Sequence, residues 1–330
     1  MFLKPRNFIF LVIIILRTII VVSSSRWINA WIALEINLIS IIPILINESN
    51  RNSTSSSIKY FITQAIASIF LILIIMIFYN IRVINLLNIN NEIILISLLI
   101  KSGIPPFHFW LPQVIERSEI AQAFLILSWQ KIAPFVILSY CLSNIIILVV
   151  LFGAMVGSIG GLNQNSVKKI LAYSSITHGS WIIFSIIIKQ NLWLIYFTIY
   201  NISLVIICLL IEKFRIKKIA DINNRKIVKN IRLVFLTRII SIAGLPPFLG
   251  FFGKLIIISS IMYSATIAFS VGVLFLASLI SLSYYLKVAY STYLINEKKI
   301  FFKKNTLKGS VLLIIIMTIV IAGPIMVYLI

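Results

Sequence analysis

Among the charged side chains within long apolar stretches of the 330-residue sequence are Glu35, Lys101, Lys131 and Lys254. A charge that faces lipid at the centre of a bilayer costs at least about 2.5–3.5 kcal/mol, so these groups are expected to face the protein interior, paired or hydrated. Removal of an ammonium group from water favours its neutral form, whereas a nearby carboxylate favours its charged form. One carboxylate and three lysines are therefore suited to pass protons along a buried relay.

The same charges also have a structural interpretation. An intramembrane charge can form a fixed ion pair, and a lysine near a helix end can extend its ammonium group to the membrane surface. The second possibility applies most to Lys254. For Arg17, Arg238 and Lys287, which also lie in apolar stretches, we predict extension to the surface or contact with another subunit.

His178 is the weakest relay candidate. It lies among hydroxyl-bearing residues in the stretch LAYSSITHGSW. A histidine in this setting either joins a hydrogen-bonded proton path or packs as a satisfied core residue.

The sequence lacks the residue patterns of cofactor sites. Its two cysteines, Cys141 and Cys208, are too few for a cysteine-ligated iron–sulfur cluster. Neither histidine has a second ligand at metal-binding spacing, and no glycine-rich nucleotide motif occurs. We therefore predict neither a metal nor a cofactor in this chain.

Lys101 lies two residues before a motif that breaks helices, GIPPF at residues 103–107. Proline has no backbone N–H, so Pro105 and Pro106 leave the carbonyls of Lys101 and Ser102 without their helical partners. Within the hydrocarbon region such groups are tolerated only against protein or a water-filled cavity. The motif therefore predicts buried polar space at membrane depth.

The motif recurs as GLPPF at residues 244–248, before Lys254. There Pro246 and Pro247 free the carbonyls of Ile242 and Ala243. Matching interruptions in two spans of opposite direction are typical of an inverted repeat with a transport path at the repeat interface.

The elements that must position these residues are transmembrane helices. The sequence is 61% hydrophobic and 11% charged, with a mean hydropathy of +1.10, which excludes a soluble fold. Its apolar runs of about twenty residues match the thickness of a bilayer. We predict an all-α bundle that forms a single membrane domain over residues 1–330, with broken helices near 92–115 and 233–262. The roughly eleven spans lie near residues 8–22, 27–46, 60–79, 92–115, 121–141, 144–162, 168–188, 191–212, 233–262, 264–290 and 310–329.

The loops predict the orientation. Residues 47–57 read as a polar loop, and 213–232 form the longest polar connection. Most lysines and arginines outside the spans fall on the side of the N-terminus, whereas the opposite side holds Arg26, Arg82 and Lys189. The positive-inside rule therefore places the N-terminus inside and, for an odd number of spans, the C-terminus outside. The net charge of +21 is thus a topology signal, which makes nucleic-acid binding a poor interpretation.

Several motifs together resemble a known family. They are LEINLISIIPIL, KSGIPPFHFWLPQVIE, WQKIAPF, GSIGGLNQNSVKKILAYSSITHGSW and GLPPFLGFFGK, which follow one another between residue 27 and about residue 290. In this order they resemble the chain 2 family of NADH:ubiquinone oxidoreductase, whose animal members are mitochondrially encoded. The pairing of PFHFW with WQKIAP favours this family over the two related antiporter-like chains.

The resemblance implies a proton-translocating module in the membrane arm of respiratory complex I, an NADH:ubiquinone reductase. It implies that Glu35 and Lys101 form a glutamate–lysine pair, that Lys131 is the central lysine and that Lys254 lies nearer the exit, with His178 at a further family position. By the same resemblance, NADH, FMN, the iron–sulfur clusters and ubiquinone bind other subunits. The chain is expected in the mitochondrial inner membrane without a transit peptide, with its N-terminus in the matrix and its C-terminus in the intermembrane space. Its expected partners are lipid and the other membrane-arm subunits.

Some residues depart from the family pattern. The family usually has Pro-Lys-Trp where this chain has Gly253-Lys254-Leu255, which leaves the local shape of the second break open. Two other functions remain possible at this point: a free-standing cation/proton antiporter, and a structural subunit that has lost pumping. A sodium-binding carrier favours a carboxylate at its site, and three lysines with one glutamate argue against it.

Overall fold

The computed structural model describes residues 5–46, 51–80, 87–143, 145–189, 191–224, 229–246, 248–260 and 265–293. These residues form helices joined by turns, and within these ranges the only β-pairing is one isolated bridge. Among the described residues, six helical segments are long and apolar enough to cross a membrane, and shorter apolar helices accompany them. The prediction of an all-α transmembrane bundle is confirmed. The number of spans stays a prediction, and the span near 310–329 lies outside the described residues.

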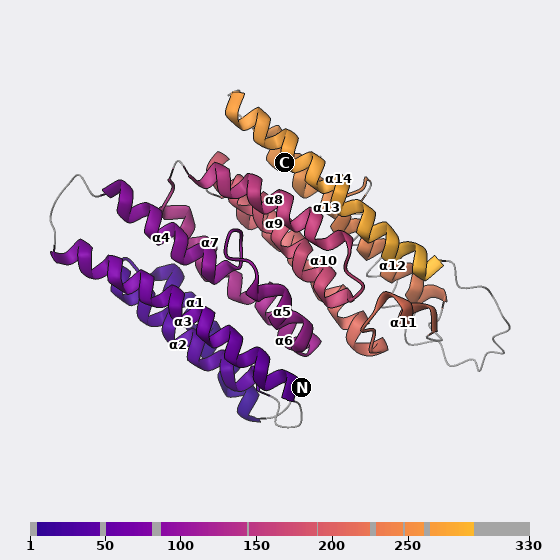
Figure 1. The fold of residues 1–330 in the computed structure, drawn as a ribbon, viewed down its shortest axis with the longest axis horizontal. Helices are drawn as coiled ribbons and strands as arrows, with labels where there is room; N and C mark the ends of the chain where they lie inside the picture. The colour runs from indigo at the N-terminus through magenta and orange to yellow at the C-terminus, as the bar shows by residue number, and fades with distance from the viewer. Residues whose placement is uncertain are drawn as a thin grey trace. The chain divides into compact units, whose positions relative to one another are not determined.

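The chain forms two compact units, residues 1–156 and 157–330. That they act as a single membrane domain stays a prediction. In the first unit α1 packs along α2, α2 packs on α3, and α4 contacts both α3 and α7 (Figure 1). Its helices are α1 (Pro5–Ser23), α2 (Trp27–Leu45), α3 (Arg51–Asn80), α4 (Leu87–Ser102), α5 (Trp110–Arg117), α6 (Ile120–Leu127) and α7 (Trp129–Tyr140), followed by α8 (Ile146–Leu162), in which the first unit ends.

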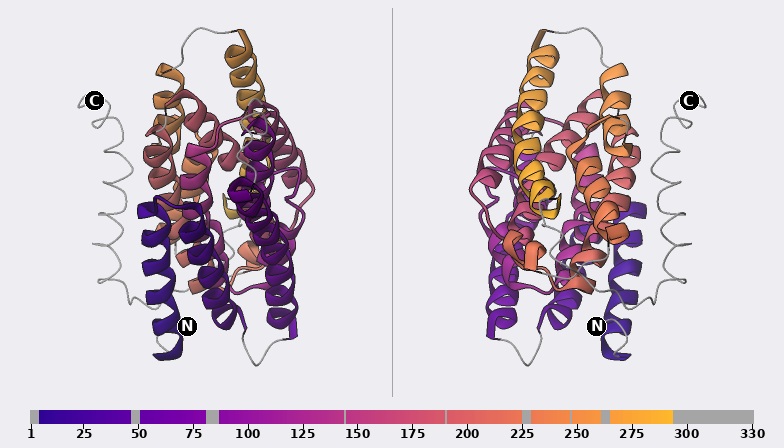
Figure 2. Two further views of the ribbon diagram at one scale, coloured as in Figure 1. Left: turned by 90° about the vertical axis from the view of Figure 1, so that its left-hand side faces the viewer. Right: turned by 90° about the vertical axis from the view of Figure 1, so that its right-hand side faces the viewer.

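In the second unit α10 contacts α9, α12 and α13, and α14 contacts α9, α11 and α12. Figure 2 shows the long α14, golden in the colour scale, running beside other helices of this unit. The helices are α9 (Val167–Ile188), α10 (Leu192–Phe214), α11 (Ile219–Asn224), α12 (Lys229–Ala243), α13 (Leu249–Ser259) and α14 (Ala265–Tyr293).

Both predicted helix breaks are present. The first separates α4 from α5, and the second separates α12 from α13. Each helix ends at a glycine in the left-handed region, with φ of 70° at Gly103 and 81° at Gly244. Glycine reaches this region without the steric cost that a Cβ atom imposes.

The two breaks also share their hydrogen bonds. Ile104 N donates to Leu99 O at 3.1 Å, and Leu245 N donates to Ile240 O at 3.4 Å. Each glycine donates to the carbonyl three residues before it, which completes the capping pattern known as the Schellman motif. The equivalent donors and acceptors lie at equivalent positions of GIPPF and GLPPF, so the sequence repeat is a structural repeat as well. The opposite direction of the two repeats stays a prediction.

The prediction of a polar loop over residues 47–57 is wrong from residue 51 onward, because α3 begins at Arg51. The hydroxyls of Ser55, Ser56 and Ser57 donate to carbonyls three residues earlier, at 2.8–3.0 Å. The hydrogen-bonding capacity of these hydroxyls is therefore met by the helix backbone, and the serine-rich stretch continues as helix. Likewise, the predicted connection 213–232 contains α11 and the start of α12.

The predicted span 121–141 is interrupted in the structure. It divides into α6 and α7 at Ser128, whose ψ of −78° departs from helical geometry. The hydroxyl of Ser128 donates to Phe124 O at 2.6 Å, a type of bond that bends helices. This interruption lies three residues before Lys131.

Candidate functional site

In the first unit, Lys101 lies in the last turn of α4, directly before the break, and its side chain is 7% exposed. The carbonyl of Lys101, which Pro105 frees, accepts a hydrogen bond from Gln64 Nε2 of α3 at 3.3 Å. Trp110 Nε1 donates to the neighbouring carbonyl of Ile100 at 3.0 Å. Side chains from α3 and α5 thus satisfy the backbone at the break, as a break within a membrane requires.

Glu35 lies in the middle of α2 and is half-buried. It lies near enough to Lys101 to interact with it electrostatically. The glutamate–lysine pair that the family resemblance implies stays a prediction.

Lys131 follows the interruption between α6 and α7 and is 2% exposed. Residue Gln130 beside it, together with Lys101, lines a small cavity of about 20 Å³, which is room for about one water molecule. The residues that line the cavity belong to α2, α3, α4 and α7. Its lining residues are Leu34, Asn37, Leu38, Tyr60, Gln64, Lys101, Gln130 and Pro134. This is the buried polar space that the first break predicted.

The sequence interpretation missed the amide pair at this cavity. Asn37 Nδ2 donates to Gln130 Oε1 at 2.8 Å, and Gln130 Nε2 donates to Asn37 Oδ1 at 3.3 Å. The reciprocal bonds tie α2, which carries Glu35, to α7, which carries Lys131. A signal was available, since amides in apolar spans commonly bond across helices.

We expect replacement of Asn37 or Gln130 alone to destabilise the first unit. Either Asn37→Leu or Gln130→Leu leaves a buried amide without its partner, at a cost of about 1–3 kcal/mol. The double variant removes both amides and should cost less than the sum of the single variants. A double-mutant cycle on the thermal inactivation of the assembled protein measures the coupling. Additive effects of the two substitutions would contradict the pairing.

In the second unit, Lys254 lies in α13, the helix that follows the second break, and is 5% exposed. Its Nζ donates to Ala243 O at 3.1 Å. That carbonyl is one of the two that the sequence predicted to be free. Lys254 Nζ also lies 5.7 Å from the ring centroid of Trp181, which gives a cation–π contact. The lysine therefore points into the protein and does not extend to the surface in this structure.

His178 is buried in α9, and its Nδ1 lies 2.8 Å from the hydroxyl of Tyr196 on α10. Its ring also packs on Tyr200, with centroids 4.7 Å apart. The histidine is thus hydrogen-bonded within an aromatic cluster of α9 and α10. The interpretation from sequence did not include either tyrosine, because a neutral side chain, unlike a charged one, does not have to face the protein interior.

The side chain of Arg238 was expected to reach the membrane surface or a partner, whereas it is 0% exposed within the second unit. That prediction is wrong for this residue, because α12 packs against α10, α13 and α14. Arg17 is half-buried and Lys287 is exposed, so their predicted roles stay predictions. The absence of a cofactor and of a metal also stays a prediction.

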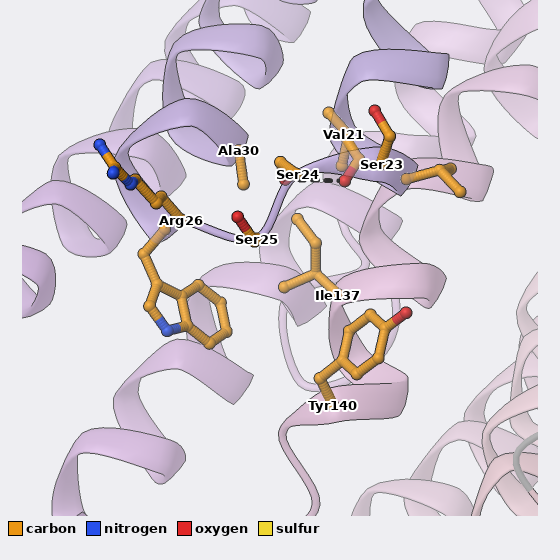
Figure 3. Close-up of a pocket in the computed structure, with 10 residues that line it drawn as sticks. Val21, Ser23, Ser24, Ser25, Arg26, Ala30, Ile137 and Tyr140 are labelled. Atoms are coloured by element: carbon orange, nitrogen blue, oxygen red, sulfur yellow. Dashed lines mark hydrogen bonds between the residues drawn. The ribbon is translucent and has the colours of Figure 1, made fainter.

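A larger cavity of about 430 Å³ lies elsewhere in the first unit, at the turn from α1 to α2 and the end of α7 (Figure 3). Ser24 Oγ donates there to Val21 O at 2.9 Å. None of the predicted relay residues lines this cavity, so we place the candidate site at the lysines. Its lining residues are Val21, Val22, Ser23, Ser24, Ser25, Arg26, Trp27, Ala30, Ile137 and Tyr140.

The fold is similar to that of solved membrane-complex subunits. A chain of respiratory complex I from Thermus thermophilus matches with a TM-score of 0.80 and 19% identity, over 97% of this chain and 78% of that one. A chain of the membrane-bound sulfane sulfur reductase, an archaeal respiratory membrane complex, matches with a TM-score of 0.84 and 15% identity, over 98% of this chain and 74% of that one.

The amino-acid sequence has closer relatives. Residues 24–281 match the family described as NADH:quinone oxidoreductase/Mrp antiporter, TM. NADH-ubiquinone oxidoreductase chain 2 of Anopheles gambiae is 37% identical over 304 residues, which cover 90% of this chain and 88% of that protein. The same protein of Locusta migratoria is 37% identical over 297 residues, 88% of this chain and 86% of its own. This chain therefore belongs to the NADH-ubiquinone oxidoreductase chain 2 family and to the wider NADH:quinone oxidoreductase/Mrp antiporter family.

Proposed function

We propose that the chain is a proton-translocating subunit of the membrane arm of respiratory complex I, and that it crosses the mitochondrial inner membrane several times. Its family membership and its fold support this assignment. In this role the chain is part of an NADH:ubiquinone reductase and carries no redox centre itself. Its partners are the other membrane-arm subunits and the lipid bilayer. The excess of basic residues on one side supports an N-terminus in the matrix and a C-terminus in the intermembrane space.

One observation supports proton transfer most strongly: each buried lysine lies at a helix interruption. Lys101 precedes the first break, Lys131 follows the interruption at Ser128, and Lys254 donates to a carbonyl freed at the second break. Irregular backbone at membrane depth is tolerated only in protein or beside water-filled cavities. This shared position beside irregular backbone supports a role for the three lysines in moving protons.

The proposed relay begins at Glu35. While its carboxylate attracts the ammonium group of Lys101, the charged lysine is favoured. When a neighbouring subunit draws this attraction away, burial favours the neutral amine, and Lys101 releases its proton through the polar cavity toward Lys131. His178 and Lys254 carry protons in the second unit.

Replacement of Lys131 by methionine tests the proposal. Methionine keeps the length and the apolar stem of lysine but cannot bind a proton, so we expect the assembled complex to lose proton pumping together with NADH oxidation. Both rates are measured in sealed inner-membrane vesicles, with the amount of assembled complex determined on native gels. Lys189→Met, at an exposed position directly after α9, is the matched control and should leave both rates near wild type. Wild-type rates in Lys131→Met would make Lys131 a structural charge and favour a non-pumping subunit.

A further inference from the structure

Tyr196 of α10 connects the helix of His178 with the helix of Lys254. Its side chain is 3% exposed, and its hydroxyl lies 2.8 Å from Nδ1 of His178 on α9. Its ring packs on Trp181 of α9, with centroids 6.4 Å apart and planes inclined by 25°. The same ring lies against α13 at Gly253. Three helices, α9, α10 and α13, therefore meet at this tyrosine.

Gly253 is the residue that lets α13 come close to the ring. A Cβ atom added at Gly253 would lie 3.0 Å from Cδ2 and 3.4 Å from Cε2 of Tyr196. Non-bonded carbon atoms attract best at about 3.5–4.0 Å, so a side chain at residue 253 would push the ring away. Trp181 also packs on the ring. The position of the Tyr196 hydroxyl is therefore set by packing against both α9 and α13.

The imidazole of His178 is held at two places by α10. Its Nδ1 bonds to Tyr196, and its ring packs on Tyr200, one turn further along the helix, with centroids 4.7 Å apart. The hydrogen bond that one ring nitrogen makes decides the protonation of the other. When the oxygen of Tyr196 accepts from Nδ1–H, Nε2 keeps a lone pair, so a proton can bind at Nε2 and leave from it. The bond to Tyr196 persists in both states of the histidine.

Lys254 belongs to the same arrangement. It follows Gly253 directly, and its Nζ lies 5.7 Å from the ring centroid of Trp181. The contact between α13 and Tyr196 is therefore next to the lysine in sequence and one hydrogen bond from the histidine in space. A change in the packing of α13 at Gly253 would shift the Tyr196 ring, and with the ring its bond to His178.

We propose that Tyr196 is the positioning residue of His178, and that Gly253 allows α13 to keep the ring of Tyr196 in place. Tyr196 holds the imidazole in the orientation and tautomer in which Nε2 exchanges the proton. The tyrosine itself neither gains nor loses a proton in this role. This inference rests on the proposed function, in which His178 carries protons.

Two substitutions and their combination test this role. Tyr196→Phe removes the hydroxyl and keeps the ring, whereas Gly253→Ala keeps the hydroxyl and displaces the ring. We expect each to lower proton pumping and NADH oxidation several-fold per assembled complex. The double variant should fall no further than Tyr196→Phe, because the hydroxyl that Gly253→Ala displaces is already absent. The matched controls, expected at wild-type rates, are Tyr290→Phe, at a 60% exposed position of α14, and Gly272→Ala in the same helix.

The double variant separates positioning from packing. A methyl group at residue 253 meets the ring of phenylalanine as it meets that of tyrosine. An effect through packing alone would therefore lower the rates again in the double variant, which would overturn the role of Gly253. Rates of Tyr196→Phe equal to those of Tyr290→Phe would overturn the positioning of His178. Tyr196→Phe decides by itself if Gly253→Ala does not assemble.

His178→Gln keeps this proposal apart from the proposed function. Glutamine retains hydrogen-bonding groups but cannot bind a proton at neutral pH. Loss of pumping in His178→Gln beside wild-type rates in Tyr196→Phe would contradict only the positioning by Tyr196. Wild-type rates in His178→Gln would instead contradict the part of His178 in the relay, and the positioning role with it.

Discussion

Gly250→Ala is expected to abolish stable assembly of the protein. A Cβ atom added at Gly250 in the first turn of α13 would overlap the carbonyl oxygen of Ser241 in α12. Overpacking costs about 1–3 kcal/mol where side chains can move aside, and a helix backbone cannot move aside without separating α12 from α13. That separation would also displace Lys254 from Ala243 O. We expect little or no assembled complex on native gels and a loss of NADH oxidation in proportion.

The matched control is Gly272→Ala in α14. Among the described residues, no atom other than those of Gly272, its two neighbours and the surrounding backbone of α14 lies within 4 Å of a Cβ atom added at Gly272. Because alanine is favoured over glycine within a helix by about 0.5–1 kcal/mol, this variant should assemble normally. Normal assembly of Gly250→Ala would contradict the close approach of the two helices at the second break.

Replacement of Lys254 should separate its two tasks. Lys254→Met removes the donor to Ala243 O and leaves a buried carbonyl unsatisfied, at a cost of about 1–3 kcal/mol. Lys254→Gln keeps an amide donor but cannot bind a proton at neutral pH. We expect lower thermal stability of the methionine variant, partial recovery of stability in the glutamine variant, and loss of proton pumping in both.

The measurements are thermal inactivation of the isolated complex and proton pumping in vesicles, each normalised to assembled complex. If Lys254→Gln recovers pumping as well as stability, Lys254 acts only as a hydrogen-bond donor. If Lys254→Met retains wild-type stability, the hydrogen bond to Ala243 does not support the second break.

The apolar runs and the proline pairs predicted most of the fold. Both breaks follow from local chemistry, because proline removes a donor whatever surrounds it and glycine then ends the helix. No proline or glycine marks the interruption at Ser128 in the sequence, where a serine hydroxyl bonds to Phe124 O. A serine of the same type at Ser56 continues a helix, so the residue type alone does not decide.

The residues of the candidate site also divide into those that the sequence predicted and those that it did not. Charged residues were predicted correctly to lie inside, because the bilayer penalises any other placement of Lys101, Lys131 and Lys254. The bonds between Asn37 and Gln130 and the contacts of the buried tyrosines were missed. Amides in an apolar span indicate a bond across helices, but the partner of each amide depends on the packing of helices that are distant in sequence.

The two breaks differ in the side chain that donates to a freed backbone carbonyl. At the first break, Gln64 of α3 donates to the carbonyl of Lys101, so the donor there is a neutral side chain that does not titrate. At the second break the donor is the ammonium group of Lys254, which bonds to the carbonyl of Ala243. In the proposed relay, the nitrogen atom of Lys254 that binds the proton is therefore also the atom that holds α13 to the end of α12.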